Sequence, residues 1–380
     1  MKNSVKKLFL VALTVSGLIV TSCTNSENFS TSSAPQSEFR VTFYNNYEGA
    51  AHEVFEEIVV QRGGKATRPA TDPVRDGYTF DNWYRDPIDQ QTYTIQDFSR
   101  EIRRDTNLYA GWLDIYDFTF DLNYAGAPAG DSVKVTHGQV AEEPDDPVRT
   151  GYAFTGWKVA KESAHYYDFR LAVLKATTVY ATWGSPGAEK VHAAVLEAEY
   201  CPSITANGGM HGATYSGGAA GKGLIQKNYY EEVEVSNDHF VHFLYVYGNT
   251  LTFNIVSSAA ASNVSLYLRL SGEYAPNGFT INKDNYKVKL NNEVIDYGDI
   301  TFANIPPQGQ PWLPFEDYLM SATLDLAAGN NVIELITDNN ERVLNEVCAT
   351  APMVDCLKIY STSRVTWPEE LKDQIIMNLD

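Results

Sequence analysis

An internal duplication in the first half of the chain constrains the fold more than any other feature of this sequence. The segment DPVRDGYTFDNWY, which begins at Asp72, returns as DPVRTGYAFTGWK from Asp146. The flanking segments VTF and NLYAGW return as FTF and TVYATW, and the offsets of the three segments are 77, 74 and 71 residues. Because the order is kept and only the loops change length, the sequence predicts one domain of about 70 residues that occurs twice.

Each copy contains short runs of alternating apolar and polar residues between Pro/Gly turns, a pattern that predicts strands. A mixed polar and apolar segment before the last strand is expected to be helical. We expect the repeated aromatic residues to form the two cores, because small domains need large side chains to bury enough area; the alternative is a surface that stacks on sugars. These residues are Tyr78, Phe80, Trp83, Tyr109 and Trp112 in the first copy and Tyr152, Phe154, Trp157, Tyr180 and Trp183 in the second.

The two copies resemble the Listeria-Bacteroides repeat, also called the internalin-type B repeat. That family carries VTF early, then P-x-R-x-GY-x-F-x-GW, then LYA-x-W, and the match covers residues 40–184. The first copy departs from the pattern with Asn82, whereas the second keeps Gly156. The resemblance implies two small β-grasp-like α+β domains, at 39–113 and 114–185, of a kind found on bacterial surface proteins and without catalysis.

The amino terminus has the profile of a secretory signal peptide. Three lysines precede a short apolar run, Leu8 to Val20, and small residues lead to Cys23. The run is about 13 residues long, which is too short for the roughly 20 that a membrane-spanning helix needs. The end of the segment resembles the bacterial lipobox, which implies a signal peptide at 1–22, acylation of Cys23 and an outer-membrane anchor. Residues 23–38 are rich in Ser, Thr and Asn and are expected to form a disordered tether.

The charge balance limits the partners. Removal of the signal peptide leaves 26 basic against 48 acidic residues, a net charge of about −22. Such a chain repels nucleic acid and anionic lipid headgroups, so we expect neutral or cationic partners, or ligands bound through a metal. The remaining cysteines, Cys201, Cys348 and Cys356, are too few for a disulfide framework, although an oxidising compartment allows one bridge.

From residue 191 the sequence changes to short apolar strands separated by Gly, Asn and Pro. This spacing predicts an all-β sandwich over 189–364, followed by a tail at 365–380. The chain as a whole is therefore predicted to be mostly β. The expected strands of the sandwich cover 194–200, 239–247, 251–256, 264–271, 286–290, 322–326, 331–337 and 354–360.

Three segments of this region resemble carbohydrate-binding modules of families 6 and 35. VLEAEYC matches their first strand, LDLAAGNNVIEL a strand near the end, and MVDCLKIY the closing strand. The resemblance covers about 191–364 and is specific mainly at the two ends. It implies a jelly-roll β-sandwich.

Glu197 and Glu199 stand two residues apart on a predicted strand, so both carboxylates are expected on one face, about 7 Å apart. Their spacing alone favours a solvated strand face with two ordinary glutamates. The resemblance adds Asp355 of the closing strand and implies a structural calcium site, because calcium prefers several hard oxygen ligands. Calcium is thus the expected cofactor.

The resemblance also implies a sugar site on loops at one end of the sandwich. Aromatic rings and amide groups on such loops suit the apolar faces and hydroxyls of sugars. A departure from the family 6 pattern, Met353 in place of an asparagine, puts the usual cleft in question, and Trp312 could instead cover the edge of the sandwich. The candidate ligand-binding residues are Trp312, Tyr229, Tyr230, His239, Asn339 and Asn340.

No segment carries a catalytic motif. The glycine-rich stretch from Gly217 lacks the pattern of a phosphate loop, and neither a zinc-binding H-E-x-x-H nor a G-x-S-x-G elbow is present. We therefore expect a non-catalytic surface lipoprotein that captures a polysaccharide, with partner proteins of a glycan-uptake system. The alternative is an adhesin or structural surface protein that binds protein.

Overall fold

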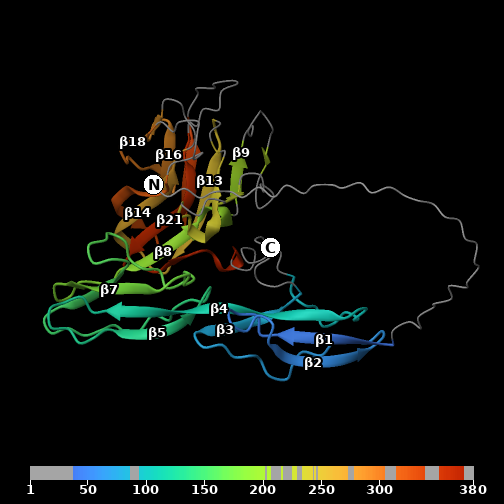
Figure 1. The fold of residues 1–380 in the computed structure, drawn as a ribbon. Helices are drawn as coiled ribbons and strands as arrows, with labels where there is room; N and C mark the ends of the chain where they lie inside the picture. Colours follow the sequence, from blue (N-terminus) through green and yellow to red (C-terminus); the bar gives the residue numbers. More distant parts are fainter. Residues whose placement is uncertain are drawn as a thin grey trace, which may run out of the picture. The chain divides into compact units, whose positions relative to one another are not determined.

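The computed structural model describes residues 37–85, 94–201, 203–206, 215–216, 225–228, 233–242, 244, 247–272, 278–303, 314–338 and 351–371. The chain divides into two compact units. The first comprises the chain up to Pro73 together with Asp81–Gly111, and the second comprises Val74–Phe80 and the chain from Trp112 onward. The mostly β class predicted from the sequence is confirmed (Figure 1). Among the residues described, no helix is long and apolar enough to cross a membrane.

The first unit contains the first copy of the duplicated segment. Its strands are β1 (Glu38–Tyr44), β2 (Val54–Gln61), most of β3 (Tyr78–Tyr84) and the start of β4 (Thr106–Asp121). β1 pairs with β2 in antiparallel and with β4 in parallel fashion, and Val41 lies opposite Thr106. Trp83 is fully buried, and its ring meets Phe43 edge to face at 4.8 Å between centroids. The aromatic core predicted for this copy is therefore confirmed at Trp83.

The second copy repeats this topology inside the second unit. The later part of β4 pairs with β5 (Asp131–Thr136) in antiparallel and with β7 (Thr177–Gly184) in parallel fashion, and β7 pairs with β6 (Ala153–Lys158). Phe118 lies opposite Thr177, the counterparts of Val41 and Thr106. Trp157 is buried against Phe120, with ring centroids 5.3 Å apart. The order of pairing confirms the duplication.

Two expectations about the second copy were wrong. Residues 159–176, where a helical segment was expected, form turns and isolated bridges, such as Lys158 to Tyr166. The rings of Tyr167 and Phe169 in this segment pack against the core of the repeat. Tyr152, predicted as a core residue, is 50% exposed. The guanidinium of Arg149 covers its ring at 3.8 Å, so the ring forms a surface cation-π pair.

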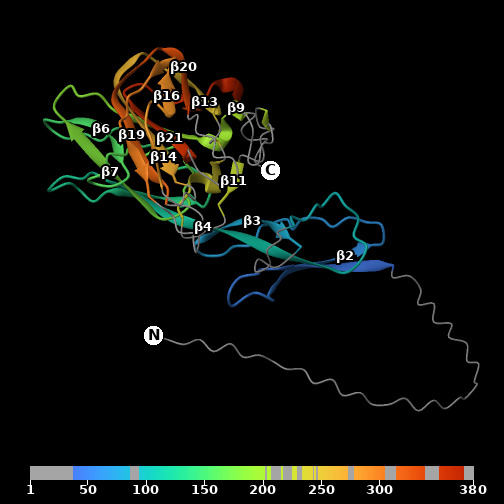
Figure 2. The same cartoon turned by 90° about the horizontal axis from the view of Figure 1, so that it is seen from above.

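The rest of the second unit is the predicted β-sandwich. Figures 1 and 2 show β13, β16 and β20 in one layer and β14, β19 and β21 in the other. One sheet contains β9 (Ser203–Ala206), β10 (Tyr215–Ser216), β13 (Thr250–Ser257), β16 (Tyr286–Leu290), β17 (Glu293–Val294), β20 (Gly329–Thr337) and β22 (Val365–Thr366). The other contains β8 (His192–Glu197), β11 (Ile225–Lys227), β12 (His239–Val241), β14 (Ala261–Ser271), β19 (Glu316–Leu326) and β21 (Met353–Ser361). The short pair β15 (Phe279–Ile281) and β18 (Ile300–Phe302) completes the domain.

The core of the sandwich lies between these sheets. Alternate side chains of β14, at Leu266, Leu268 and Leu270, are buried and face Phe253 and other apolar residues of the opposite sheet. Apolar residues occupy every second position of β14 in the sequence, and they are the buried ones because successive side chains of a strand point to opposite faces. The intervening residues of β14 and β21 therefore form the outer face of their sheet, where the candidate site lies.

Candidate functional site

The two ends of the sandwich sequence meet in one pair of strands. β8, the first strand, pairs with β21, the closing strand, and Glu197 lies opposite Cys356. Figure 1 shows the two strands side by side. The register of this antiparallel pair therefore brings together carboxylates from two segments that are about 160 residues apart in the chain.

A β-bulge places Asp355 at this point. Arg269 of β14 lies opposite Cys356, and the next residue, Leu270, lies opposite Val354, so Asp355 is the extra residue of β21. Its carboxylate is fully buried. The side chain of Arg269 donates from Nε to Oδ2 at 2.9 Å, and the backbone N–H of Ser236 donates to both carboxylate oxygens at 3.1 Å. Burial raises the pKa of Asp355 to about 7, although these donors lower it.

The two glutamates are buried beside Asp355, but not on one strand. β8 ends at Glu197, and Ala198–Tyr200 form a 3₁₀ turn that carries Glu199. The expectation of one continuous strand through both residues was therefore wrong. Glu199 is buried on the turn next to Glu197, outside the close group that Glu197 forms with Asp355 and Cys356. Burial raises the pKa of each, and so does the charge of a neighbouring carboxylate.

A tight turn supplies the hydrogen bonds of this cluster. The Ser236 hydroxyl donates to Glu197 Oε1 at 2.7 Å, and the Asn237 amide donates to Glu199 Oε1 at 3.0 Å. Asn237 has a φ of 49°, a left-handed conformation that asparagine tolerates better than most residues. In the part of the chain that the structure describes, Glu197 Oε2 and Glu199 Oε2 have no hydrogen-bond partner.

The donor set fits a hard divalent cation. A buried carboxylate oxygen without a partner is costly, and a bound cation removes that cost. Glu197 and Asp355 bring carboxylate oxygens within 4.8 Å of one another, and Glu199, on the adjoining turn, lies outside that group. Glu197 and Asp355 would therefore form the centre of a calcium site, which accepts carboxylate oxygens in flexible geometry, and Glu199 would have to turn toward them to complete it. Cys356 Sγ lies within 4.8 Å of ligand atoms of Glu197 and Asp355, but a thiol does not suit calcium.

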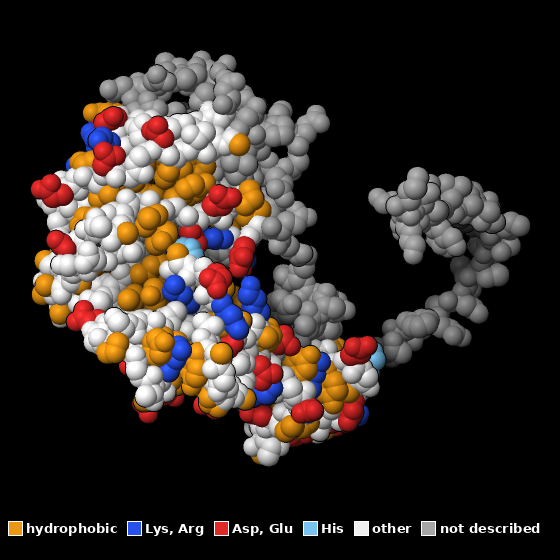
Figure 3. Space-filling model, turned by 90° about the vertical axis from the view of Figure 1, so that its left-hand side faces the viewer, with side chains coloured by type: hydrophobic (Ala, Val, Ile, Leu, Met, Phe, Trp, Pro, Cys, Tyr) orange, Lys and Arg blue, Asp and Glu red, His pale blue; other side chains and the backbone are white. Residues whose placement is uncertain are grey.

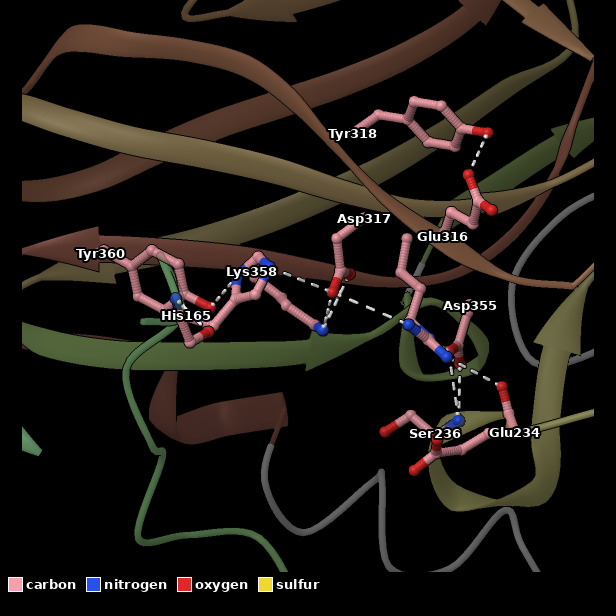
Figure 4. A network of polar contacts seen from close by, with 11 residues as sticks. His165, Glu234, Ser236, Glu316, Asp317, Tyr318, Asp355, Lys358 and Tyr360 are labelled. Carbon is pink, nitrogen blue, oxygen red and sulfur yellow. Dashed lines mark hydrogen bonds and ion pairs between the residues drawn. The ribbon is translucent and has the colours of Figure 1, made fainter. Parts of the chain in front are cut away.

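A second group of charges adjoins the cluster on the same outer face. Asp317 of β19 accepts from Lys358 at 2.8 Å and lies 3.4 Å from His165 Nε2 (Figure 4). The other imidazole nitrogen, Nδ1, lies 2.9 Å from the Tyr360 hydroxyl. Burial lowers the pKa of His165, although the neighbouring Asp317 carboxylate raises it. Figure 3 shows a face of the molecule on which basic and acidic side chains gather beside a histidine. No sequence motif marked this network.

His165 belongs to the second repeat, and hydrogen bonds join this repeat to the sandwich. Asp168 is almost fully buried; it accepts hydrogen bonds from Arg170 and from the backbone N–H of Val195 at 2.8 Å. Arg170 in turn donates to the backbone carbonyls of Val365 and Ala193. Repeat and sandwich are thus joined by oriented hydrogen bonds, not by a bare linker.

Asp168→Ala is expected to destabilise the second unit by about 1–3 kcal/mol, because it leaves the Val195 N–H and the Arg170 guanidinium without their acceptor. Chemical denaturation of the full chain measures the change. The matched control is Asp97→Ala at the equivalent position of the first repeat, where the carboxylate is exposed and bonds to nearby Ser99 and Arg100. Equal effects of the two substitutions would contradict a specific role for Asp168.

Of the predicted sugar-binding residues, His239 is the one that the structure describes. Cys23, Tyr229, Tyr230, Trp312, Asn339 and Asn340 lie outside the described residues. His239 begins β12, is half-buried, and its Nδ1 lies 2.9 Å from the Asn237 carbonyl, next to the carboxylate cluster. Trp367, a second tryptophan outside the repeats, packs against the core and stacks on Phe253 at 6.0 Å.

The cysteines that the structure describes form no bridge. Cys201 and Cys356 are both buried and free, and burial raises the pKa of both thiols. Cys348 lies outside the described residues. The pair Cys201 and Cys356 is therefore excluded as the one bridge that the sequence allowed.

Comparison with known families identifies the duplicated domain. Residues 39–111 and 116–182 match the model of the Listeria-Bacteroides repeat domain, so the chain carries two such domains, as predicted. Internalin H of Listeria monocytogenes is 36% identical over 117 residues, which cover 29% of this chain and 20% of that protein. The chain spans no more than a fifth of the length of the curated relatives that it matches.

The sandwich is similar to solved carbohydrate-binding modules of family 35. The module of Abf62 from Cellvibrio japonicus is 14% identical, and the match covers 47% of this chain and 99% of that one with a TM-score of 0.28. A family 35 module from Clostridium thermocellum is 18% identical, and the match covers 44% of this chain and 96% of that one, also with a TM-score of 0.28. The strand pairing of this chain itself shows that the domain is a sandwich of two sheets.

Proposed function

We propose that this protein is a non-catalytic glycan-binding lipoprotein of the bacterial surface, whose β-sandwich captures a polysaccharide. The observation that carries the proposal is the pairing of β8 with β21, which brings the buried Glu197 and Asp355 together, with the buried Glu199 on the adjoining turn. That gathering is what the resemblance of the two end segments to carbohydrate-binding modules implied. In this proposal calcium is the structural cofactor, held by these three carboxylates, and the partner is a polysaccharide.

The register of the described strands supports a ligand site at one end of the sandwich. β14 and β21 are antiparallel, with Ser271 opposite Met353, and Glu316 of β19 lies opposite Leu270. The amino-terminal ends of β19 and β21 therefore lie at the same end of this sheet. These two strand ends follow directly on the segments that contain Trp312, Asn339 and Asn340. Candidate aromatic and amide residues thus belong to connections that reach one end of the domain.

A binding experiment on the full mature chain tests the proposal. We expect binding to at least one of three immobilised probes: a glucuronic acid-containing xylan, a β-1,4-mannan and a β-1,3-galactan. The choice follows solved neighbours, which include a family 35 module in complex with a glucuronic acid-containing disaccharide, a β-(1,4)-mannanase and an exo-β-1,3-galactanase with β-1,3-galactotriose. Trp312→Ala should abolish binding and leave the melting temperature nearly unchanged, because a stacking ring carries much of the affinity for a sugar. A loss of about 3–5 kcal/mol in stability would instead make Trp312 a core residue.

Cys23→Ser is expected to release the protein from the membrane fraction, because the substitution removes the thiol that takes the lipid. Fractionation of cells that produce either form, followed by mass determination of the mature amino terminus, measures the outcome. Cys201→Ser is the matched control, since that thiol is buried in the sandwich and has no part in anchoring. A Cys23→Ser protein that still matured and partitioned with membranes would contradict the lipid anchor.

One observation keeps protein binding as a second candidate function. Val74 and Val148 occupy equivalent positions of the two repeats and are 88% and 91% exposed. Each precedes an arginine that stacks on a tyrosine, Arg75 on Tyr78 and Arg149 on Tyr152. A chain that bound none of the three glycans and was retained by a host or bacterial surface protein through these valines would favour the adhesin.

A further inference from the structure

We propose that the cleft between the second repeat and the outer face of the β14–β21 sheet binds a neutral saccharide, so that the second repeat is part of the ligand site. The cleft lies within the second unit and has a volume of about 900 Å³. Pockets that enclose small ligands measure about 300–1,000 Å³, so this one has room for a short oligosaccharide. The inference rests on the proposed glycan binding and extends the ligand site to side chains of the second repeat.

The first argument is the composition of the two walls. The second repeat contributes most of the apolar lining, with Val159, Leu171 and Leu174 beside Tyr166 and Tyr167, and also the polar His165, Asp168 and Arg170. The sandwich contributes a polar floor, which holds Arg269, Asp317, Lys358 and Tyr360. Apolar faces on one side and hydrogen-bonding groups on the other are what a sugar ring requires.

The second argument is the charge of the floor. Arg269 is paired with Asp355 at 2.9 Å, and Lys358 is paired with Asp317 at 2.8 Å. Each cation is therefore already matched by a carboxylate, and the floor has no surplus positive charge for an anion. What it offers is fixed hydrogen-bond donors and acceptors, which suits the hydroxyl groups of a neutral sugar. The mutual contacts also hold these groups in place before a ligand arrives, which lowers the cost of binding.

The third argument comes from the difference between the two repeats. The backbone N–H of Gln96 donates to the carbonyl of Trp83, and that of Tyr167 donates to the carbonyl of Trp157, so the two loops are structurally equivalent. At the same loop positions, the first repeat reads TIQDFS from Thr94 and the second reads HYYDFR from His165. In the second loop, His165, Tyr166 and Arg170 contact Tyr360 and Val365 of the sandwich. The second repeat is thus adapted to form this cleft with the sandwich, which a plain spacer would not require.

The test uses the full mature chain and places a bulky side chain in the cleft. Ala172 is exposed and lines the cleft, so Ala172→Trp fills space without disturbing a core. The matched control is Glu101→Trp, because the isolated bridges Lys65 to Glu101 and Val140 to Ala172 show that the two positions are equivalent. Binding to the neutral mannan and galactan probes is measured by calorimetry, with the anionic glucuronic acid-containing xylan as the comparison, and folding is measured by the melting temperature. We expect Ala172→Trp to weaken binding at least tenfold and Glu101→Trp to leave it unchanged.

Hydrogen exchange with and without the bound probe gives a second measurement that needs no substitution. We expect the ligand to protect the amides of 165–172 and to leave those of 94–101 unchanged. Binding that survives both Ala172→Trp and Leu174→Trp, with no protection of 165–172, would overturn the inference while the proposed function stands. Loss of binding in Trp312→Ala alone would overturn it in the same way. Failure of the unaltered chain to bind any of the three probes would overturn both.

Discussion

Trp83→Ala is expected to destabilise the first unit by about 3–5 kcal/mol, the usual cost of removing a large buried aromatic side chain. Trp83 is fully buried, and its ring contacts Phe43 and Phe55 at centroid distances of 4.8 and 5.8 Å. A domain of about 70 residues has few other large side chains with which to close such a cavity. Since a small domain is stabilised by only a few kcal/mol, most of the first unit should unfold at ambient temperature.

Urea denaturation of the full chain, followed by near-ultraviolet circular dichroism, measures this loss as a separate early transition. Val74→Ala provides the control, because that valine is 88% exposed and its truncation should change stability by less than about 0.5 kcal/mol. Trp157→Ala should act in the same way on the second copy, where the ring is also buried. A Trp83→Ala chain as stable as the Val74→Ala chain would show that the duplicated tryptophans are not core residues.

The sequence predicted the duplication and the longer strands of the sandwich well because both depend on local patterns, although the strand expected over 239–247 ends at Val241. Leu266, Leu268 and Leu270 alternate with polar residues, and this period alone determines which side of β14 faces the core. The repeat is visible because two stretches of one chain can be compared directly. Neither inference requires knowledge of which strands become neighbours.

The geometry of the carboxylate cluster could not be predicted in the same way. Asp355 is an extra residue in β21, and the segment MVDCLKIY reads as a regular strand with no sign of a bulge. Glu199 lies in a 3₁₀ turn although its spacing from Glu197 fits a strand equally well. The contribution of Ser236 and Asn237 depends on a left-handed residue in a loop, for which the sequence offered no periodic signal.

The attachment of the second repeat was missed for a different reason. Its signal was present, since HYYDFR replaces TIQDFS at the same position of the two copies. Its partners on the sandwich are backbone groups of Ala193, Val195 and Val365, which have no characteristic side chain. A comparison of where the copies differ, in addition to where they agree, would have marked this loop as a contact surface.

Removal of divalent cations with a chelator is expected to lower the melting temperature of the second unit, and calcium at 100 times its dissociation constant should restore about 2.7 kcal/mol. The reason is the buried group of Glu197, Glu199 and Asp355, in which two carboxylate oxygens have no protein partner among the residues described. Glu197→Gln removes one negative charge with little change in shape. It should therefore abolish the gain from calcium, whereas Glu293→Gln on an exposed strand should keep it.

The pH dependence of stability distinguishes calcium binding from a cluster that is simply protonated. Burial raises the pKa of Asp355 from 3.8 to about 7 and raises that of both glutamates, so the folded chain without metal holds more protons than the unfolded chain. Its stability should therefore fall as the pH rises from about 4 through 7, and the glutamates should extend the fall to higher pH. Calcium requires the ionised carboxylates, so its stabilising effect should grow over the same range and offset the fall. Melting temperatures measured from pH 5 to 9, in chelator and in calcium, test this directly, and two parallel curves would rule out a calcium ion held by these three residues.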